Sequence, residues 1–70
     1  MSSQHDLAVG MLEGYIARVI DPECSAVAVK ASANTAILIF RTLGVISIAE
    51  DLYYTERLHR IYDRRQGREA

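Results

Sequence analysis

Residues 21–44 read DPECSAVAVKASANTAILIFRTLG, and this stretch decides whether the chain is all helical or mixed. Its apolar residues recur every three or four positions, as they do on one side of a helix. They are Ala26, Val29, Ala33, Ala36, Ile37, Phe40 and Leu43. The Asp21-Pro22 pair is typical of a helix start, and Gly44 is typical of a position just past a helix end. The stretch therefore predicts a helix over residues 22–43.

A β-hairpin is the alternative for the same stretch. Residues 25–32, SAVAVKAS, alternate in the manner of a strand, and residues 35–40, TAILIF, are rich in β-branched side chains. A turn at residues 33–35 would then give an α+β chain in the order α-β-β-α. The abundance of alanine and the lack of an Asn-Gly or Asp-Gly turn speak against it. We therefore favour an all-α chain.

The two flanking segments also predict helices. Ser3 followed by Asp6, and Ser47 followed by Glu50, have the spacing of a capping box. The stripe expected to be buried in residues 3–20 is Leu7, Ala8, Met11, Leu12, Tyr15, Ile16 and Val19. The buried face expected in residues 47–66 is Ile48, Leu52, Tyr54, Thr55, Leu58, Ile61 and Tyr62. We expect one small domain over residues 1–70, with the last two helices as an antiparallel hairpin and a flexible tail at 67–70.

The composition indicates a surplus of apolar side chains. Hydrophobic residues make up 50% of the 70 positions, whereas a chain of this size buries only about 60% of its unfolded surface. Some of the surplus must stay outside, where it marks a contact surface. The predicted second helix is apolar on more than one side, and small residues line one edge of the first. We expect self-association through Gly10, Gly14, Ala17, Val27, Leu38 and Ile39.

A basic row marks the last predicted helix. The row consists of Tyr53, Arg57, Arg60, Arg64 and Arg68, which are three or four residues apart and share one side. Guanidinium groups bind carboxylates and phosphates through paired hydrogen bonds, and a tyrosine can stack on a base. Interleaved acids and a net charge of −1 suit a solvated helix face or a protein partner better than nucleic acid. Binding of nucleic acid or a nucleotide is the alternative function.

Groups for catalysis or metal binding are sparse. His5 and His59 lie far apart, the single cysteine is Cys24, and no His or Cys spacing typical of a metal site occurs. We expect no catalytic residue, no cofactor and no metal. Asn34 and Arg41 interrupt the most apolar stretch, and the polar N-terminus lacks the features of a signal peptide. The sequence predicts a cytoplasmic, non-enzymatic regulatory or interaction protein that acts as a homo-oligomer and has no contact with a membrane.

Overall fold

The computed structural model describes residues 3–66, and that range contains three α-helices and no strand. Helix α1 spans Gln4–Ile20, α2 spans Ala26–Thr42 and α3 spans Ile48–Arg65. The all-α prediction is confirmed, and the β-hairpin alternative is wrong. Alanine favours the helix throughout this stretch, and its apolar residues reach the core at helical spacing. The tail predicted at residues 67–70 lies outside the described residues.

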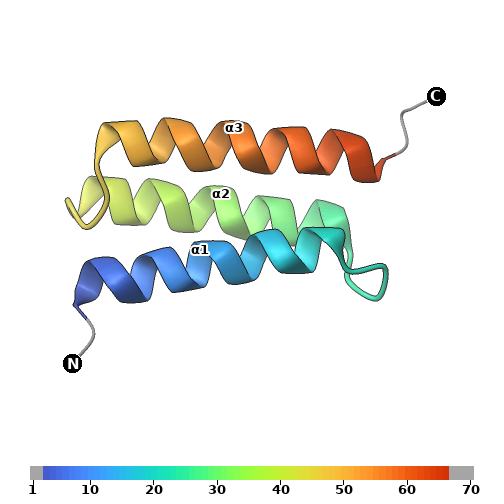
Figure 1. Cartoon of the computed structure of the whole chain (residues 1–70), viewed down its shortest axis with the longest axis horizontal. Coiled ribbons are helices and arrows are strands. Elements are labelled where there is room, and N and C mark those ends of the chain that lie inside the picture. Colours follow the sequence, from blue (N-terminus) through green and yellow to red (C-terminus); the bar gives the residue numbers. More distant parts are fainter. Residues whose placement is uncertain (1–2, 67–70) are drawn as a thin grey trace.

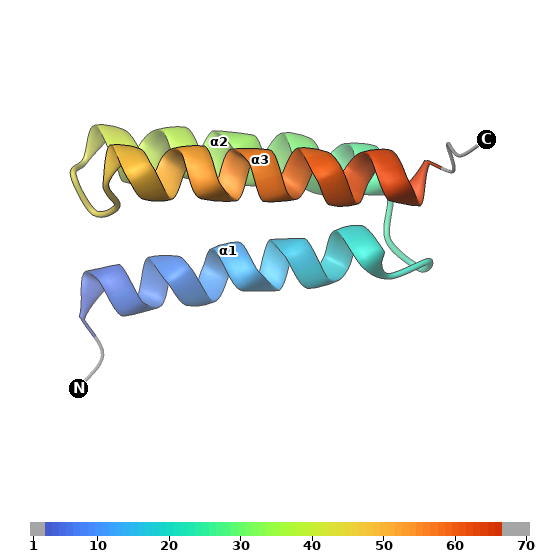
Figure 2. The same ribbon diagram turned by 45° about the horizontal axis from the view of Figure 1, so that its top comes forward.

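Each helix packs against the other two. Helix α2 returns alongside α1, and α3 lies beside α2 (Figure 1). In the turned view α1 lies below the pair formed by α2 and α3 (Figure 2). The buried core consists of Ala8, Leu12, Ile16, Val19, Ala26, Ala33, Ala36, Ile37, Ile46, Tyr54 and Leu58. All three helices therefore share one core.

Helix α2 begins at Ala26, four residues later than the sequence predicts. Asp21 ends α1 instead of capping α2, and its Oδ1 accepts a hydrogen bond from the backbone N–H of Glu23 at 2.9 Å. An aspartate that bonds two residues onward makes a turn of its own. Ser25 then caps α2, because its Oγ accepts a hydrogen bond from the N–H of Ala28 at 3.2 Å. Cys24 consequently lies in the connection before α2.

The connection between α2 and α3 follows its local sequence signals closely. Gly44 has a φ of +75°, in the left-handed region that glycine enters without strain. The N–H of Val45 donates to the carbonyl of Phe40 at 2.8 Å, which satisfies a carbonyl at the end of α2. Ser47 and Glu50 form the predicted capping box, with hydrogen bonds of 3.1 and 2.8 Å. Both signals are confirmed.

Several side chains that the sequence assigns to the core are exposed. Leu7 and Met11 on α1 are 60% and 50% exposed, and Leu43 after α2 is 70% exposed. On α3, Ile48 and Leu52 are 61% and 65% exposed, while Tyr54 and Leu58 are buried. The predicted stripes are wider than the strip that two neighbouring helices can cover. The excess apolar area therefore faces outward.

Candidate interaction surface

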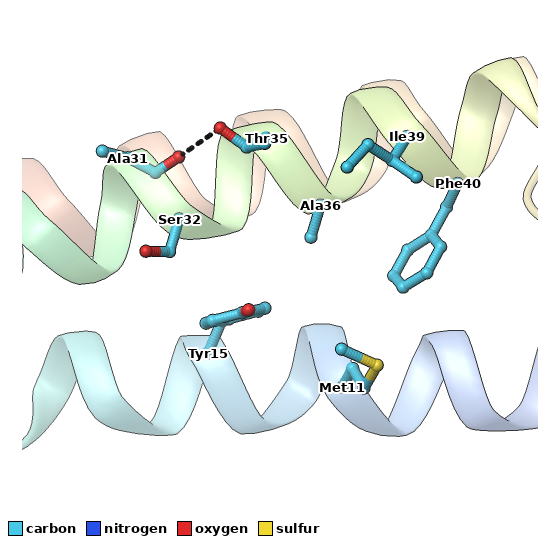
Figure 3. Close-up of a pocket in the computed structure, with 8 residues that line it drawn as sticks. All are labelled: Met11, Tyr15, Ala31, Ser32, Thr35, Ala36, Ile39 and Phe40. Atoms are coloured by element: carbon cyan, nitrogen blue, oxygen red, sulfur yellow. Dashed lines mark hydrogen bonds between the residues drawn. The ribbon is translucent and has the colours of Figure 1, made fainter.

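The α1–α2 groove is a hollow of about 510 Å³ between these two helices (Figure 3). Its lining is Met11, Tyr15, Ala31, Ser32, Thr35, Ala36, Ile39 and Phe40. Met11 and Tyr15 point from α1 toward α2, and Phe40 points back toward α1 (Figure 3). The hydroxyl of Thr35 donates to the carbonyl of Ala31 at 3.1 Å, so it is already partnered. The groove is uncharged and mainly apolar, which suits apolar side chains as its occupants.

A second hollow, of about 420 Å³, lies on the outer side of α1 and shares Met11 and Tyr15 with the groove. Its lining is Asp6, Leu7, Gly10, Met11, Gly14, Tyr15 and Arg18. A Cβ atom built on Gly10 or on Gly14 meets nothing within 4 Å. Packing within the subunit therefore does not require glycine at either position.

The remaining residues predicted for self-association also face outward. Ala17 on α1 is exposed. On α2, Val27, Leu38 and Ile39 are 61%, 65% and 49% exposed. Together with Leu7 and Met11 they give α1 and α2 an outer surface rich in apolar side chains.

Charged groups concentrate where α3 meets the other helices. The ion pairs between helices are His5–Glu50, Glu13–Arg57 at 2.7 Å and Arg41–Asp51 at 3.0 Å. The ammonium group of Lys30 on α2 also lies 4.8 Å from the ring centre of Tyr62 on α3. Across residues 3–66, each ion pair between helices thus has one partner on α3, and none joins α1 to α2. The seam between α1 and α2 is held by apolar contacts.

The basic row is only partly available to a ligand. Arg57 is held by Glu13, and Arg60 lies 3.9 Å from Glu56 one turn earlier. Arg64 is exposed and lines a small hollow with Ile20. Arg68 of the predicted row lies outside the described residues. Among the described members of the row, Arg60 and Arg64 present their charges outward.

Sequence analysis did not single out Glu13, which contacts Arg57 of the basic row. Its Oε2 accepts hydrogen bonds from Arg57 at 2.7 Å and from the hydroxyl of Tyr54 at 3.3 Å. The hydrogen bond from Arg57 lowers the pKa of Glu13, whereas burial raises the pKa of Tyr54. The Arg57 guanidinium also lies 5.8 Å from the ring centre of Tyr53, so these two members of the basic row are neighbours in the structure. No spacing rule links Glu13 to a residue 44 positions away.

Arg65 is a second residue that sequence analysis did not place. It donates to the carbonyl of Val19 near the end of α1 and to the carbonyl of Cys24 in the following turn, each at 3.4 Å. The last carbonyls of a helix lack partners within the helix, and a cation satisfies them well. Arg65 therefore ties the end of α3 to the connection between α1 and α2.

Comparison with known proteins finds no matching family model, and no curated protein or solved structure shows significant similarity to the chain. Within residues 3–66, no group of three His, Cys, Asp or Glu side chains is placed to hold a metal ion. None of the three described helices is both long enough and apolar enough to span a bilayer. The local geometry is therefore the basis for a functional proposal.

Proposed function

We propose that this chain is a small non-enzymatic interaction protein that forms homo-oligomers and binds another protein as an inhibitor, adaptor or accessory regulator. The observation that carries the proposal is the uncharged, apolar groove between α1 and α2, whose lining includes the half-exposed Met11 and Ile39. Contiguous apolar surface on a small protein marks a place where another molecule binds. A cytoplasmic location belongs to the same proposal, supported by the free thiol of Cys24.

Energetics support association through these side chains. Full burial of a Val, Leu, Ile or Met side chain contributes about 1.5–3 kcal/mol. Five such side chains are about half exposed in each subunit, so burying all of them on two subunits would contribute about 8–15 kcal/mol. They are Leu7, Met11, Val27, Leu38 and Ile39. Association itself costs about 4–15 kcal/mol in lost translational and rotational freedom. Burial of these side chains therefore offsets the cost of association, and the balance becomes more favourable as one contact covers more of them.

The proposed partner site lies on the outer side of α3 and includes Tyr53, Arg60 and Arg64. Tyr53 is 54% exposed, and an exposed tyrosine beside arginine is typical of residues that dominate binding energy. A partner with acidic side chains complements this surface. Arg57 takes part only if the partner offers a carboxylate that displaces Glu13.

An antiparallel hairpin of α2 and α3 is the platform in this proposal. Two contacts support it. Arg41 near the end of α2 pairs with Asp51 near the start of α3, and Lys30 near the start of α2 meets Tyr62 near the end of α3. These contacts join α3 to α2 on the side of α2 that lies away from the groove.

Size-exclusion chromatography with multi-angle light scattering tests self-association. We expect a mass that is a multiple of 7.8 kDa at micromolar concentration and that falls on dilution. A mass of 7.8 kDa across the whole concentration series would refute the oligomer.

Partner binding is tested by comparing capture of cellular proteins by the wild-type chain and by the Arg57→Ala/Arg60→Ala variant. We expect a defined protein that the wild type captures and the variant loses. Thermal stability with and without nucleic acid or nucleotides, at low and high salt, tests the alternative. A stabilisation seen only at low salt and lost in the same variant would favour anion binding over a protein partner.

A further inference from the structure

We propose that the outer side of α1 is the contact between two copies of this chain, with the two α1 helices packed antiparallel across a two-fold axis. This inference rests on the self-association proposed above and names its surface and orientation. The α1–α2 groove and the outer hollow of α1 share Met11 and Tyr15, so they form one continuous apolar face. The charged side chains that line it are Asp6 and Arg18, near opposite ends of α1.

Those two charges select the second copy as the occupant. A two-fold axis brings the same surface of both subunits together, so that each contact occurs twice. If Gly10 of one α1 meets Gly14 of the other in an antiparallel pair, residues four positions farther out on each helix also meet. Those residues are Asp6 and Arg18. The spacing therefore gives two equivalent ion pairs, one at each end of the contact.

A parallel pair of α1 helices would reverse this advantage. It would set Asp6 against Asp6 and Arg18 against Arg18, and like charges in contact oppose association. The antiparallel arrangement is the one in which this face is complementary to itself.

The two glycines fit the same arrangement. Glycine is a poor helix former, and nothing within the subunit fills the space beside Gly10 or Gly14. Their missing side chains allow two helix backbones to approach closely. Leu7 and Met11, which are at least half exposed in the single subunit, then become buried between the two α1 helices. Ile39 of α2 lies at the margin of that contact, where it lines the adjoining groove.

Complementary charge variants test both the surface and the orientation. Asp6→Arg sets two arginines opposite each other at each end of its own dimer, and Arg18→Asp sets two aspartates opposite each other. We expect each variant alone to self-associate at least about tenfold more weakly than the wild type. An equimolar mixture should recover association, because every pair in the mixed dimer joins an arginine to an aspartate. Sedimentation equilibrium measures each constant, and circular dichroism confirms that each variant is helical.

The control is a matched pair of variants on α3, Glu56→Arg and Arg60→Asp. These change the net charge by the same amounts, and the two positions form an exposed i,i+4 pair away from the proposed contact. Arg60 belongs to the proposed site for a different protein, which is absent from the purified chain. Neither variant should therefore weaken the dimer, and their mixture should gain nothing. A control mixture that gains as much as the test mixture would show general charge attraction and refute the specific contact.

A second pair of variants avoids any effect of the charges on folding. Gly14→Leu fills the space between the two helices, and leucine is the better helix former. We expect the variant to remain helical and to lose self-association by at least about tenfold. Ala49→Leu adds the same side chain to the exposed N-terminal turn of α3 and should leave association unchanged.

The outcomes separate this inference from the proposed function. A monomeric wild type overturns both. An oligomeric wild type that none of the α1 variants weakens overturns only the α1 contact, because another surface must then hold the oligomer. A wild type that Gly14→Leu weakens but neither charge variant weakens overturns only the antiparallel orientation, because a parallel pair has two like-charge contacts before and after each charge reversal. Weakened single variants without recovery in the mixture overturn the proposed ion pairs.

Discussion

The carboxylate of Glu13 sets how much of the basic row a ligand can reach. It holds Arg57 at 2.7 Å and accepts from Tyr54, so these groups are already partnered across α1 and α3. The Arg57 and Glu13 side chains are 30% and 45% exposed, which places the pair near the surface. Exposed ion pairs contribute about 0.2–1 kcal/mol to stability. The pair is weak enough for a partner to displace, yet it orients Arg57 in the free subunit.

Removing the Glu13–Arg57 pair should lower the free energy of unfolding by a small but measurable amount. For Glu13→Gln, Arg57→Ala and the double variant, we expect a coupling of about 0.5–1 kcal/mol in the free energy of unfolding. Urea denaturation of the four proteins provides the measurement. Arg60→Ala is the control, because Arg60 lies 3.9 Å from Glu56 and both are exposed. Additive single effects would mean that the contact between Glu13 and Arg57 does not stabilise the fold.

His5 should make stability depend on pH. Its hydrogen bond to Glu50 raises the pKa of His5 above the ordinary value of 6.5, and the N–H of Ser47, followed by His5, lowers the pKa of Glu50. A raised pKa in the folded chain gives stabilisation that is complete below the unfolded value and is lost as pH rises through the folded value. We expect the free energy of unfolding to fall as pH rises from the acid side through neutrality, above the ordinary histidine value of 6.5.

Two histidine variants test the origin of that slope. His5→Gln should flatten the profile over this range, as followed by thermal melts in a series of buffers. His59→Gln should keep the slope, because it leaves the His5–Glu50 pair intact. A slope that survives in His5→Gln would contradict the assignment.

At the scale of elements, the helix ends show what local sequence can predict. The capping box of Ser47 and the left-handed Gly44 depend on residues within four positions, and both were predictable. The start of α2 was not, because Asp21 and Ser25 are both good caps and lie only four residues apart. The choice depends on Asp21 bonding to Glu23, which leaves Ser25 as the cap. Competing local signals therefore limited the prediction to within one helical turn.

One substitution should have opposite effects at two glycines. Gly44→Ala should lower the free energy of unfolding by about 1–2 kcal/mol, because alanine at a φ of +75° is strained even though its Cβ has open space. Gly10→Ala should raise it by about 1 kcal/mol, because the added Cβ also meets nothing and alanine favours helix. Chemical denaturation of dilute protein measures both. If both substitutions changed the free energy of unfolding in the same direction, backbone conformation would not be what distinguishes Gly44 from Gly10.

At the scale of the molecule, the core and the candidate site differ in how much of each could be predicted from the sequence. Residues near the middle of each stripe, such as Leu12 and Leu58, are buried as expected. Leu7 and Leu52 belong to the same stripes and yet are 60% and 65% exposed. Periodicity gives the direction of an apolar face, but the strip that is covered depends on where neighbouring helices pack. Contacts between residues far apart in sequence, such as Glu13 and Arg57, depend on the same packing. They could not be predicted from the sequence either.

Two leucines should separate the core from the outer surface. Leu12 is 2% exposed, and Leu12→Ala should cost about 2–5 kcal/mol through lost burial and the cavity left behind. A chain of this size has about 3–5 kcal/mol of stability in total, so the variant should lose a large part of its stability and melt well below the wild type. Leu52→Ala removes a side chain that is 65% exposed and should change stability by no more than about 0.5 kcal/mol. Circular dichroism measures the melting curve of each variant. Similar curves for the two would contradict the assignment of Leu12 to the core and Leu52 to the surface.

Dissolved salt should act unequally on the three helices, since the ion pairs between helices in residues 3–66 all have one partner on α3. The Debye length shortens from about 8 Å at physiological ionic strength to about 3 Å in molar salt, which screens exposed charges. Salts such as sulfate, in contrast, strengthen apolar contacts by their exclusion from the protein surface. Concentrated sulfate therefore weakens the ion pairs of α3 while it strengthens the apolar core that all three helices share. Under those conditions the attachment of α3 depends mainly on its buried side chains, such as Tyr54 and Leu58.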